Sequence, residues 1–134
     1  MCAIIIEKDG VRYAEYLPAT SRPSVGGFFS ERNAGFQFGV MIHPEGHRER
    51  AHYHSKIAVG ESHLSEFIFI QKGVMTISFY LSNGIEFNRI KLSVGDAIVL
   101  IDGIHSYIVN SDLQAIIIKQ GPFRDGVEKM LVDF

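Results

Sequence analysis

Cysteine, tryptophan and long apolar runs are scarce or missing in this sequence of 134 residues. A single cysteine, Cys2, excludes a disulfide within the chain, and such sparing use of cysteine is typical of a reducing compartment. Near the start, only five consecutive residues, 2–6, are apolar, and no basic leader precedes them, so the pattern does not match a signal peptide. No apolar run approaches the ~20 residues that cross a bilayer, and we therefore expect a cytoplasmic protein with no membrane partner.

An excess of basic residues is also missing. The chain has 13 Lys and Arg against 15 Asp and Glu, which gives a formal net charge of −2. Binding to a phosphate backbone needs a net basic face, so this balance predicts no nucleic-acid partner. Apolar residues make up 46% of the chain, which is enough to form the core of a single domain over residues 1–134.

Short runs of Ile, Val, Phe and Tyr alternate with turn signals along most of the chain. Asn83-Gly84 is the sharpest signal, because both residues tolerate the positive φ of a type I′ hairpin turn. Further turn signals are Lys72-Gly73 and Ser111-Asp112. The predicted strands are 3–8, 11–16, 36–43, 51–58, 65–71, 74–81, 85–92, 97–101, 104–110 and 113–119. This succession predicts an all-β sandwich or barrel rather than a parallel α/β sheet.

Two segments depart from this pattern. Apolar side chains recur with helical spacing near the end of the chain, at Val127, Met130, Leu131 and Phe134. With Asp125 as a candidate N-cap, residues 125–134 are predicted to form a short C-terminal helix or strap on the barrel. Residues 17–35 contain two prolines with several Gly and Ser, and are predicted to form a long loop.

His52 and His54 are the first candidate site residues. Residues two apart on a strand face the same side, so both imidazoles would converge on one point while Tyr53 faces away. The alternative is a pair of histidines in solvent on a polar strand face. Glu66 opens a strand whose next four residues are apolar, so its carboxylate either lies in solvent or points inward and needs a cation. His105 opens another strand, after a turn at 102–103.

The order of these residues resembles the two motifs of the cupin superfamily. The first motif is a histidine, any residue, a histidine, then a glutamate, and a glycine seven positions later. The residues that match it are His52, His54, Glu66 and Gly73. The second motif is a glycine, a strand, a turn and a late histidine. The residues that match it are Gly95, Gly103 and His105.

This resemblance implies a double-stranded β-helix, the jelly-roll barrel of the cupins, over residues 36–123. N-terminal strands in 1–35 and the strap or helix in 124–134 would flank it. The implied metal ligands are His52, His54, Glu66 and His105. Such a set suits divalent Fe, Mn, Ni, Co or Zn better than Mg or Ca, which prefer oxygen ligands. Eleven residues separate the second histidine from the glutamate, where the family has three or four, so His63 is the alternative fourth ligand.

Three functions stay open at this point. The first is a metal-dependent enzyme or binder acting on a small oxygen-rich metabolite, a sugar or a carboxylate. Segments 65–73, 95–105 and 116–123 resemble small single-domain cupins of surface-polysaccharide and nucleotide-sugar pathways. The second is a metal-independent nucleotide-sugar ketoisomerase, a group that the stretch RERAHYHSK resembles, in which a histidine pair including His54 would move protons. The third is a ligand-binding module without catalysis.

The resemblance also implies a homodimer, formed through terminal strands, and the apolar edge 3–6 is the candidate strand. Aromatic residues that are expected in the core or in a dimer interface are Phe28, Phe29, Phe36, Phe38, Phe67 and Phe69.

Five further side chains near the motifs have a structural and a functional interpretation. Tyr107 follows His105 by two and should share its face, either as part of the barrel wall or as a catalytic donor to a substrate. His43 and His47 flank a Pro-Glu-Gly turn and are expected in solvent rather than as ligands. Arg48 and Arg50 form either a solvated face or a clamp for a carboxylate or phosphate.

Overall fold

The chain folds into β-strands because its apolar residues come in short, β-branched and aromatic runs between turns. The computed structural model describes residues 3–54, 65–122 and 129–133. The strands are β1 (Ile4–Lys8), β2 (Val11–Tyr16), β3 (Gly27–Phe28), β4 (Phe36–His43), β5 (Arg48–His54), β6 (Glu66–Tyr80), β7 (Glu86–Leu92), β8 (Ala97–Leu100), β9 (Ile104–Gln120) and β10 (Lys129–Leu131). These ranges contain no helix, and so none long and apolar enough to span a membrane.

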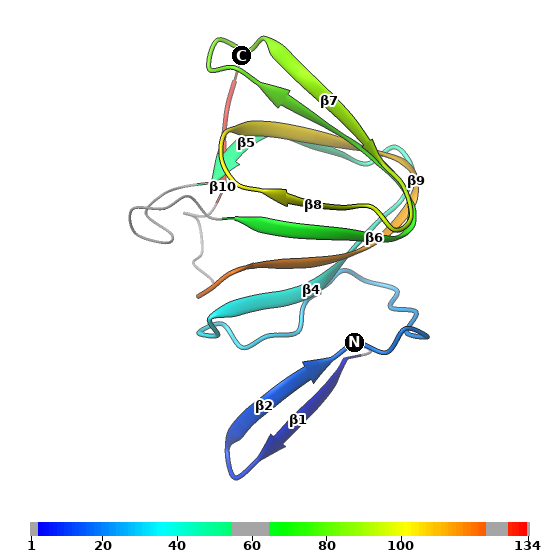
Figure 1. Ribbon diagram of the computed structural model, residues 1–134, viewed down its shortest axis with the longest axis vertical. Helices are drawn as coiled ribbons and strands as arrows, with labels where there is room; N and C mark the ends of the chain where they lie inside the picture. The colour runs from blue at the N-terminus through cyan, green and yellow to red at the C-terminus, as the bar shows by residue number, and fades with distance from the viewer. Residues whose placement is uncertain (1–2, 55–64, 123–128, 134) are drawn as a thin grey trace.

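Eight strands form one curled antiparallel sheet that folds over until its two halves face each other (Figure 1). The long strands β6 and β9 pair with each other and pass through both halves. The half that we call the β5 half has the order β10-β5-β9-β6-β7. The other, the β4 half, has the order β3-β4-β9-β6-β8. This is the predicted all-β barrel of jelly-roll type.

The bend between the two halves lies where the sequence predicted two turns. Neither turn signal ends a strand: β6 continues through Gly73, and β9 continues through Asp112. Instead, the register of the pairing between β6 and β9 shifts three times between Ile70 and Met75. Gly73 has a φ of 84°, and a Cβ on it would lie 2.2 Å from the carbonyl oxygen of Asp112. The four strands predicted over this stretch are therefore two long strands with a bulge at which they bend.

The core fills the space between the two halves. β6 contributes Ile68 and Ile70 before the bend and Met75 and Ile77 after it, all at most 2% exposed. Alternate residues of a strand share one face. In a regular strand the even-numbered pair and the odd-numbered pair would therefore lie on opposite faces of the sheet, and the bulge brings both pairs into the same core. Buried partners from the other strands are Leu92, Leu100, Val109, Leu113, Ala115 and Ile117.

The prediction of a C-terminal helix is wrong for the residues that the structure describes. Residues 129–131 form β10, which pairs antiparallel with β5 so that Met130 lies opposite Tyr53 and Leu131 opposite His52. β5 is otherwise an edge strand, and covering its free backbone groups outweighs the helical spacing of a few apolar side chains. The N-cap candidate Asp125, and residues 126–128 and 134, lie outside the described residues.

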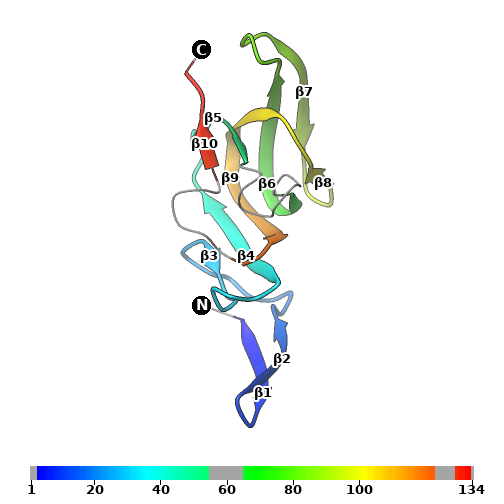
Figure 2. The ribbon, with the colours of Figure 1, turned by 90° about the vertical axis from the view of Figure 1, so that its left-hand side faces the viewer.

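β1 and β2 form a hairpin that pairs with none of the other described strands and extends from one end of the barrel (Figure 2). Its turn, Asp9-Gly10, has φ angles of 54° and 77°, the positive pair of a type I′ turn. Asn83-Gly84, for which that turn was predicted, differs. Gly84 alone has a positive φ there, and the amide of Leu81 donates to the carbonyl of Ile85, so the loop is one residue longer.

Candidate metal centre

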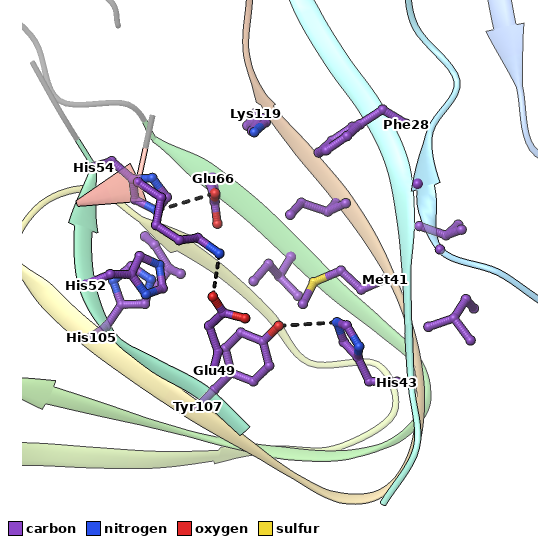
Figure 3. Close-up of a pocket in the computed structure, with 18 residues that line it drawn as sticks. Phe28, Met41, His43, Glu49, His52, His54, Glu66, His105, Tyr107 and Lys119 are labelled. Atoms are coloured by element: carbon purple, nitrogen blue, oxygen red, sulfur yellow. Dashed lines mark hydrogen bonds and ion pairs between the residues drawn. The ribbon is translucent and has the colours of Figure 1, made fainter. Parts of the chain in front are cut away.

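Three histidines meet in the space between the two halves of the sheet (Figure 3). β5 places His52 and His54 on its inner face, and His105 at the start of β9 is the direct cross-strand neighbour of His52. One ring nitrogen from each lies within 4.8 Å of the other two, and the three residues are only 2%, 6% and 5% exposed. The predicted convergence of these side chains is therefore observed, and the solvent-exposed alternative is not.

Hydrogen bonds to the backbone orient two of the rings. Nδ1 of His52 lies 2.7 Å from the carbonyl oxygen of Arg50, so this nitrogen carries the proton and Nε2 keeps its lone pair. His105 makes a corresponding hydrogen bond with the backbone of Gly103. Such bonds fix the tautomer and direct the free nitrogen of each imidazole toward a shared ion.

Burial keeps the imidazoles of His52 and His105 uncharged at neutral pH. It lowers the pKa of His105 to about 3, with smaller contributions from His52 and His54. Burial is also the main cause that lowers the pKa of His52. A protonated imidazole cannot bind a metal, so the environment that removes the proton also prepares the ligand.

Glu66 lies beside the histidine cluster. Its carboxylate oxygen Oε1 is 3.3 Å from Nε2 of His54, and its side chain is 13% exposed. Of the two positions considered for Glu66, the structure therefore shows the inward one, although its carboxylate is outside the set of three mutually close ligand atoms. The alternative residue, His63, lies outside the described residues.

The donor chemistry fits a divalent transition metal. Three imidazoles with one adjacent carboxylate are a set that Fe, Mn, Ni, Co and Zn accept, whereas Ca and Mg prefer oxygen ligands. A partly buried carboxylate against buried imidazoles is also stabilised by a positive charge nearby. The three histidines could therefore hold a metal ion, as the sequence predicted.

A pocket of about 470 Å³ opens beside the cluster (Figure 3). Its walls combine apolar side chains with a few polar ones, a composition common in sites for small molecules. The apolar lining includes Phe28, Met41, Ile68, Leu100 and Ile117. The polar lining beyond the histidine cluster includes His43, Glu49, Glu66, Tyr107, Lys119 and Lys129.

Tyr107 and His43 form a second polar group in this pocket. The hydroxyl of Tyr107 is 3.3 Å from Nε2 of His43, and His43 stacks on His47 with ring centroids 3.8 Å apart. Burial raises the pKa of Tyr107 and lowers that of His43, so the phenol stays protonated and the imidazole neutral. Tyr107 shares the face of His105 as predicted, but the expectation that His43 lies in solvent is wrong, because β4 carries it to the pocket wall.

Glu49 and Lys129 are pocket residues that the sequence analysis missed. The register of β5 shifts between Glu49, which pairs with Tyr107, and His52, which pairs with His105. This bulge turns two residues three positions apart toward the same side, which strict alternation forbids. Burial raises the pKa of Glu49, but an ion pair with Lys129 outweighs burial and leaves the pKa below its ordinary value. No local signal in the sequence marks either residue, since Lys129 lies in the predicted helix.

Comparison with known proteins identifies the architecture. No protein-family model and no curated protein sequence matches this chain. A cupin-2 domain protein from Shewanella frigidimarina has a similar structure, with a TM-score of 0.53 over 75% of this chain and 84% of its own, at 18% identity. KdgF from Halomonas sp. is similar with a TM-score of 0.56 over 75% of this chain and 81% of its own, at 16% identity.

The fold is that of the cupins. Larger proteins contain the same fold. An oxalate decarboxylase from Lactobacillus farciminis matches 75% of this chain with a TM-score of 0.56 at 16% identity, and the match spans only 28% of that enzyme. At these identities the likeness concerns the fold alone, so the chemistry of this chain has to be argued from its own pocket.

Proposed function

We propose that this chain is a metal-binding cupin that binds or converts a small oxygen-rich metabolite, a sugar or a carboxylate, in the pocket beside its histidine cluster. The observation that carries the proposal is the convergence of three buried histidines, with one ring nitrogen of each within 4.8 Å of the other two, on a pocket of about 470 Å³. The proposed metal ligands are His52, His54, His105 and Glu66. A bound divalent ion would supply Lewis acidity, which polarises a carbonyl or stabilises an enediolate.

The pocket residues have roles of their own in this proposal. Tyr107 keeps its proton at neutral pH and can donate a hydrogen bond to a substrate oxygen, while His43 at 3.3 Å orients that hydroxyl. Lys129 offers positive charge from β10 to a carboxylate, although Glu49 neutralises part of it. The apolar wall excludes water from the site, which strengthens each of these polar interactions.

Metal uptake by ligand variants tests the proposal. Protein purified without chelator, or reconstituted with each of the five ions, should hold about one metal per chain. His52→Ala and His105→Ala should abolish uptake, and Glu66→Gln should weaken it, while His47→Ala, a matched loss of an imidazole outside the cluster, should leave it unchanged. Circular dichroism establishes that each variant is folded. Less than ~0.1 metal per folded wild-type chain after reconstitution, where a full site binds about one, would contradict the proposal.

A metal-independent isomerase acting on a nucleotide sugar is the second candidate. His54, buried against Glu66 at 3.3 Å, is the residue that would move a proton between neighbouring carbons. Treatment with EDTA distinguishes the two candidates. Activity on deoxythymidine- or uridine-diphosphate sugars that survives EDTA and is lost in His54→Ala supports the isomerase. Loss of binding or turnover with the metal supports the first proposal, and binding without turnover supports a non-catalytic ligand module.

We propose in addition that the chain forms a homodimer through its N-terminal hairpin. Ile4, Ile6 and Tyr16 share one face of the hairpin and are each at least half exposed, with no strand of their own barrel against them. The outer face of the β4 half presents a second apolar surface. Partly exposed residues on it are Phe67, Phe69, Ile116 and Ile118. Two copies related by a two-fold axis would cover the hairpin of one with this face of the other.

A further inference from the structure

The outer face of the β5 half carries a polar hollow that is separate from the histidine cluster. Its volume is about 530 Å³, similar to that of the interior pocket. Strand alternation explains its position: His105 and Tyr107 point inward from β9, so Ser106 and Asn110 point outward. We call this hollow the outer groove. The polar residues that line it include Arg48, Glu49, Arg50, Thr76, Ser78, Tyr80, Arg89, Ser106, Tyr107 and Asn110.

The pairing register arranges these side chains in an order across the sheet. Ser106 of β9 lies directly opposite Ser78 of β6, which lies opposite Arg89 of β7. On the other side of β9, Arg48 lies opposite Ile108, and Arg50 occupies the bulge next to Ser106. Hydroxyl groups therefore form the floor of the outer groove, with guanidinium groups along both edges.

The two edges differ in available charge. Arg89 forms a two-point ion pair with Glu86, with distances of 3.1 and 3.0 Å, and Ser78 also hydrogen-bonds to that carboxylate. By contrast, the guanidinium groups of Arg48 and Arg50 form no hydrogen bond or ion pair with any residue in the described part of the chain. Glu49, between them in sequence, borders both pockets, but its carboxylate is already paired with Lys129, which lines the interior pocket. Two guanidinium groups are thus free to bind an external anion.

The floor of the groove adds neutral groups. The hydroxyl of Thr76 donates to Oδ1 of Asn110 at 2.7 Å, which leaves the amide nitrogen of Asn110 as a donor. The hydroxyls of Tyr80 and Ser106 lie 2.8 Å apart at the other end of the floor. Hydroxyl and amide groups of this kind match the hydroxyls of a sugar, and free guanidinium groups match a phosphate or a carboxylate.

We propose that the outer groove is a second ligand site, in which Arg48 and Arg50 bind the oxyanion of a phosphorylated or carboxylated sugar. The hollow is larger than one oxyanion requires, so the hydroxylated body of the ligand occupies the floor over Ser106 and Asn110. The bulge in β5 links this site to the interior pocket, because the same irregularity turns Glu49 inward and places Arg50 at the edge of the groove. The Arg48-Glu49-Arg50 segment is therefore a clamp rather than a simple solvated face.

Binding measurements on metal-free protein test this site independently of the histidine cluster. The probes are inorganic phosphate, glucose 1-phosphate and glucuronate, titrated by calorimetry at low ionic strength in the presence of EDTA. The variant Arg48→Gln/Arg50→Gln removes both charges and keeps the backbone carbonyl of Arg50 that orients His52. The expected result is at least a tenfold loss of affinity, because each charge-assisted hydrogen bond is lost. Metal uptake by this variant should equal that of the wild type.

A matched control removes two positive charges elsewhere. Lys8→Ala/Arg22→Ala changes exposed residues far from the groove in sequence and should bind the probes as the wild type does. Preference for glucose 1-phosphate or for glucuronate identifies the ligand as a phosphate or a carboxylate, and both support the site. Absence of binding for all three probes, or an equal loss in the control, would overturn the proposal. Lys129→Ala separates the two pockets, since loss of binding in this variant alone would place the anion in the interior and also overturn it.

Discussion

Three imidazoles buried at one point make the stability of the metal-free protein depend on pH. The pKa of His105 is about 3 in the folded chain and about 6.5 in the unfolded chain. Between these values the unfolded state binds a proton that the folded state does not. The free energy of unfolding therefore falls as the pH drops from about 6.5 toward 3, by up to roughly 1.4 kcal/mol per pH unit for this residue.

Urea unfolding of EDTA-treated protein between these pH values measures the effect. The comparison variant is His105→Gln, which keeps the size of the side chain and removes its ionisation. We expect a smaller decrease of the unfolding free energy with falling pH in the variant than in the wild type. Identical pH slopes for the two proteins would show that His105 is not a neutral, buried imidazole.

At the scale of elements, the barrel depends on the bend in β6 and β9. Gly73→Ala places a methyl group where φ is 84° and the Asp112 carbonyl oxygen is 2.2 Å away, so we expect a loss of at least about 2 kcal/mol in unfolding free energy. Two controls separate the causes. Gly46 has a φ of 89° but no atom within 4 Å of an added Cβ, so Gly46→Ala should lower the unfolding free energy by less than Gly73→Ala. Gly35 has neither a positive φ nor a close neighbour, so Gly35→Ala should leave the unfolding free energy unchanged. Equal unfolding midpoints for Gly73→Ala and Gly35→Ala would contradict the account.

The same elements show which parts of the structure a sequence can predict. Alternation and turn residues predicted most strands, and the spacing of His52 and His54 predicted that both face inward, because these signals are local. The bulges are not local signals. Gly73 was predicted to lie in a turn, and strict alternation, which assumes that no residue is inserted, would place Glu49 on the face opposite His52. β10 was missed for a related reason, since its pairing with β5 joins residues far apart in the chain.

At the scale of the whole molecule, the hairpin predicts the state of assembly. A two-stranded hairpin is marginally stable alone, and Ile6 on its exposed face is 53% exposed. Light scattering at micromolar concentration should give twice the 15.0 kDa mass of one chain. Ile6→Asp should shift this mass toward the monomer, while Val94→Asp, a matched change at an exposed apolar residue of the β7–β8 turn, should not. A monomeric wild-type chain would refute the proposed dimer.

The central claim is that His52, His54 and His105 bind one divalent metal ion inside the cupin barrel. Anomalous diffraction at the metal edge, from crystals of protein purified without chelator, tests it most directly. The account predicts one strong peak about 2.0–2.2 Å from a nitrogen of each of the three imidazoles. A map without a peak at this point, from protein reconstituted with each of the five metals, would contradict it.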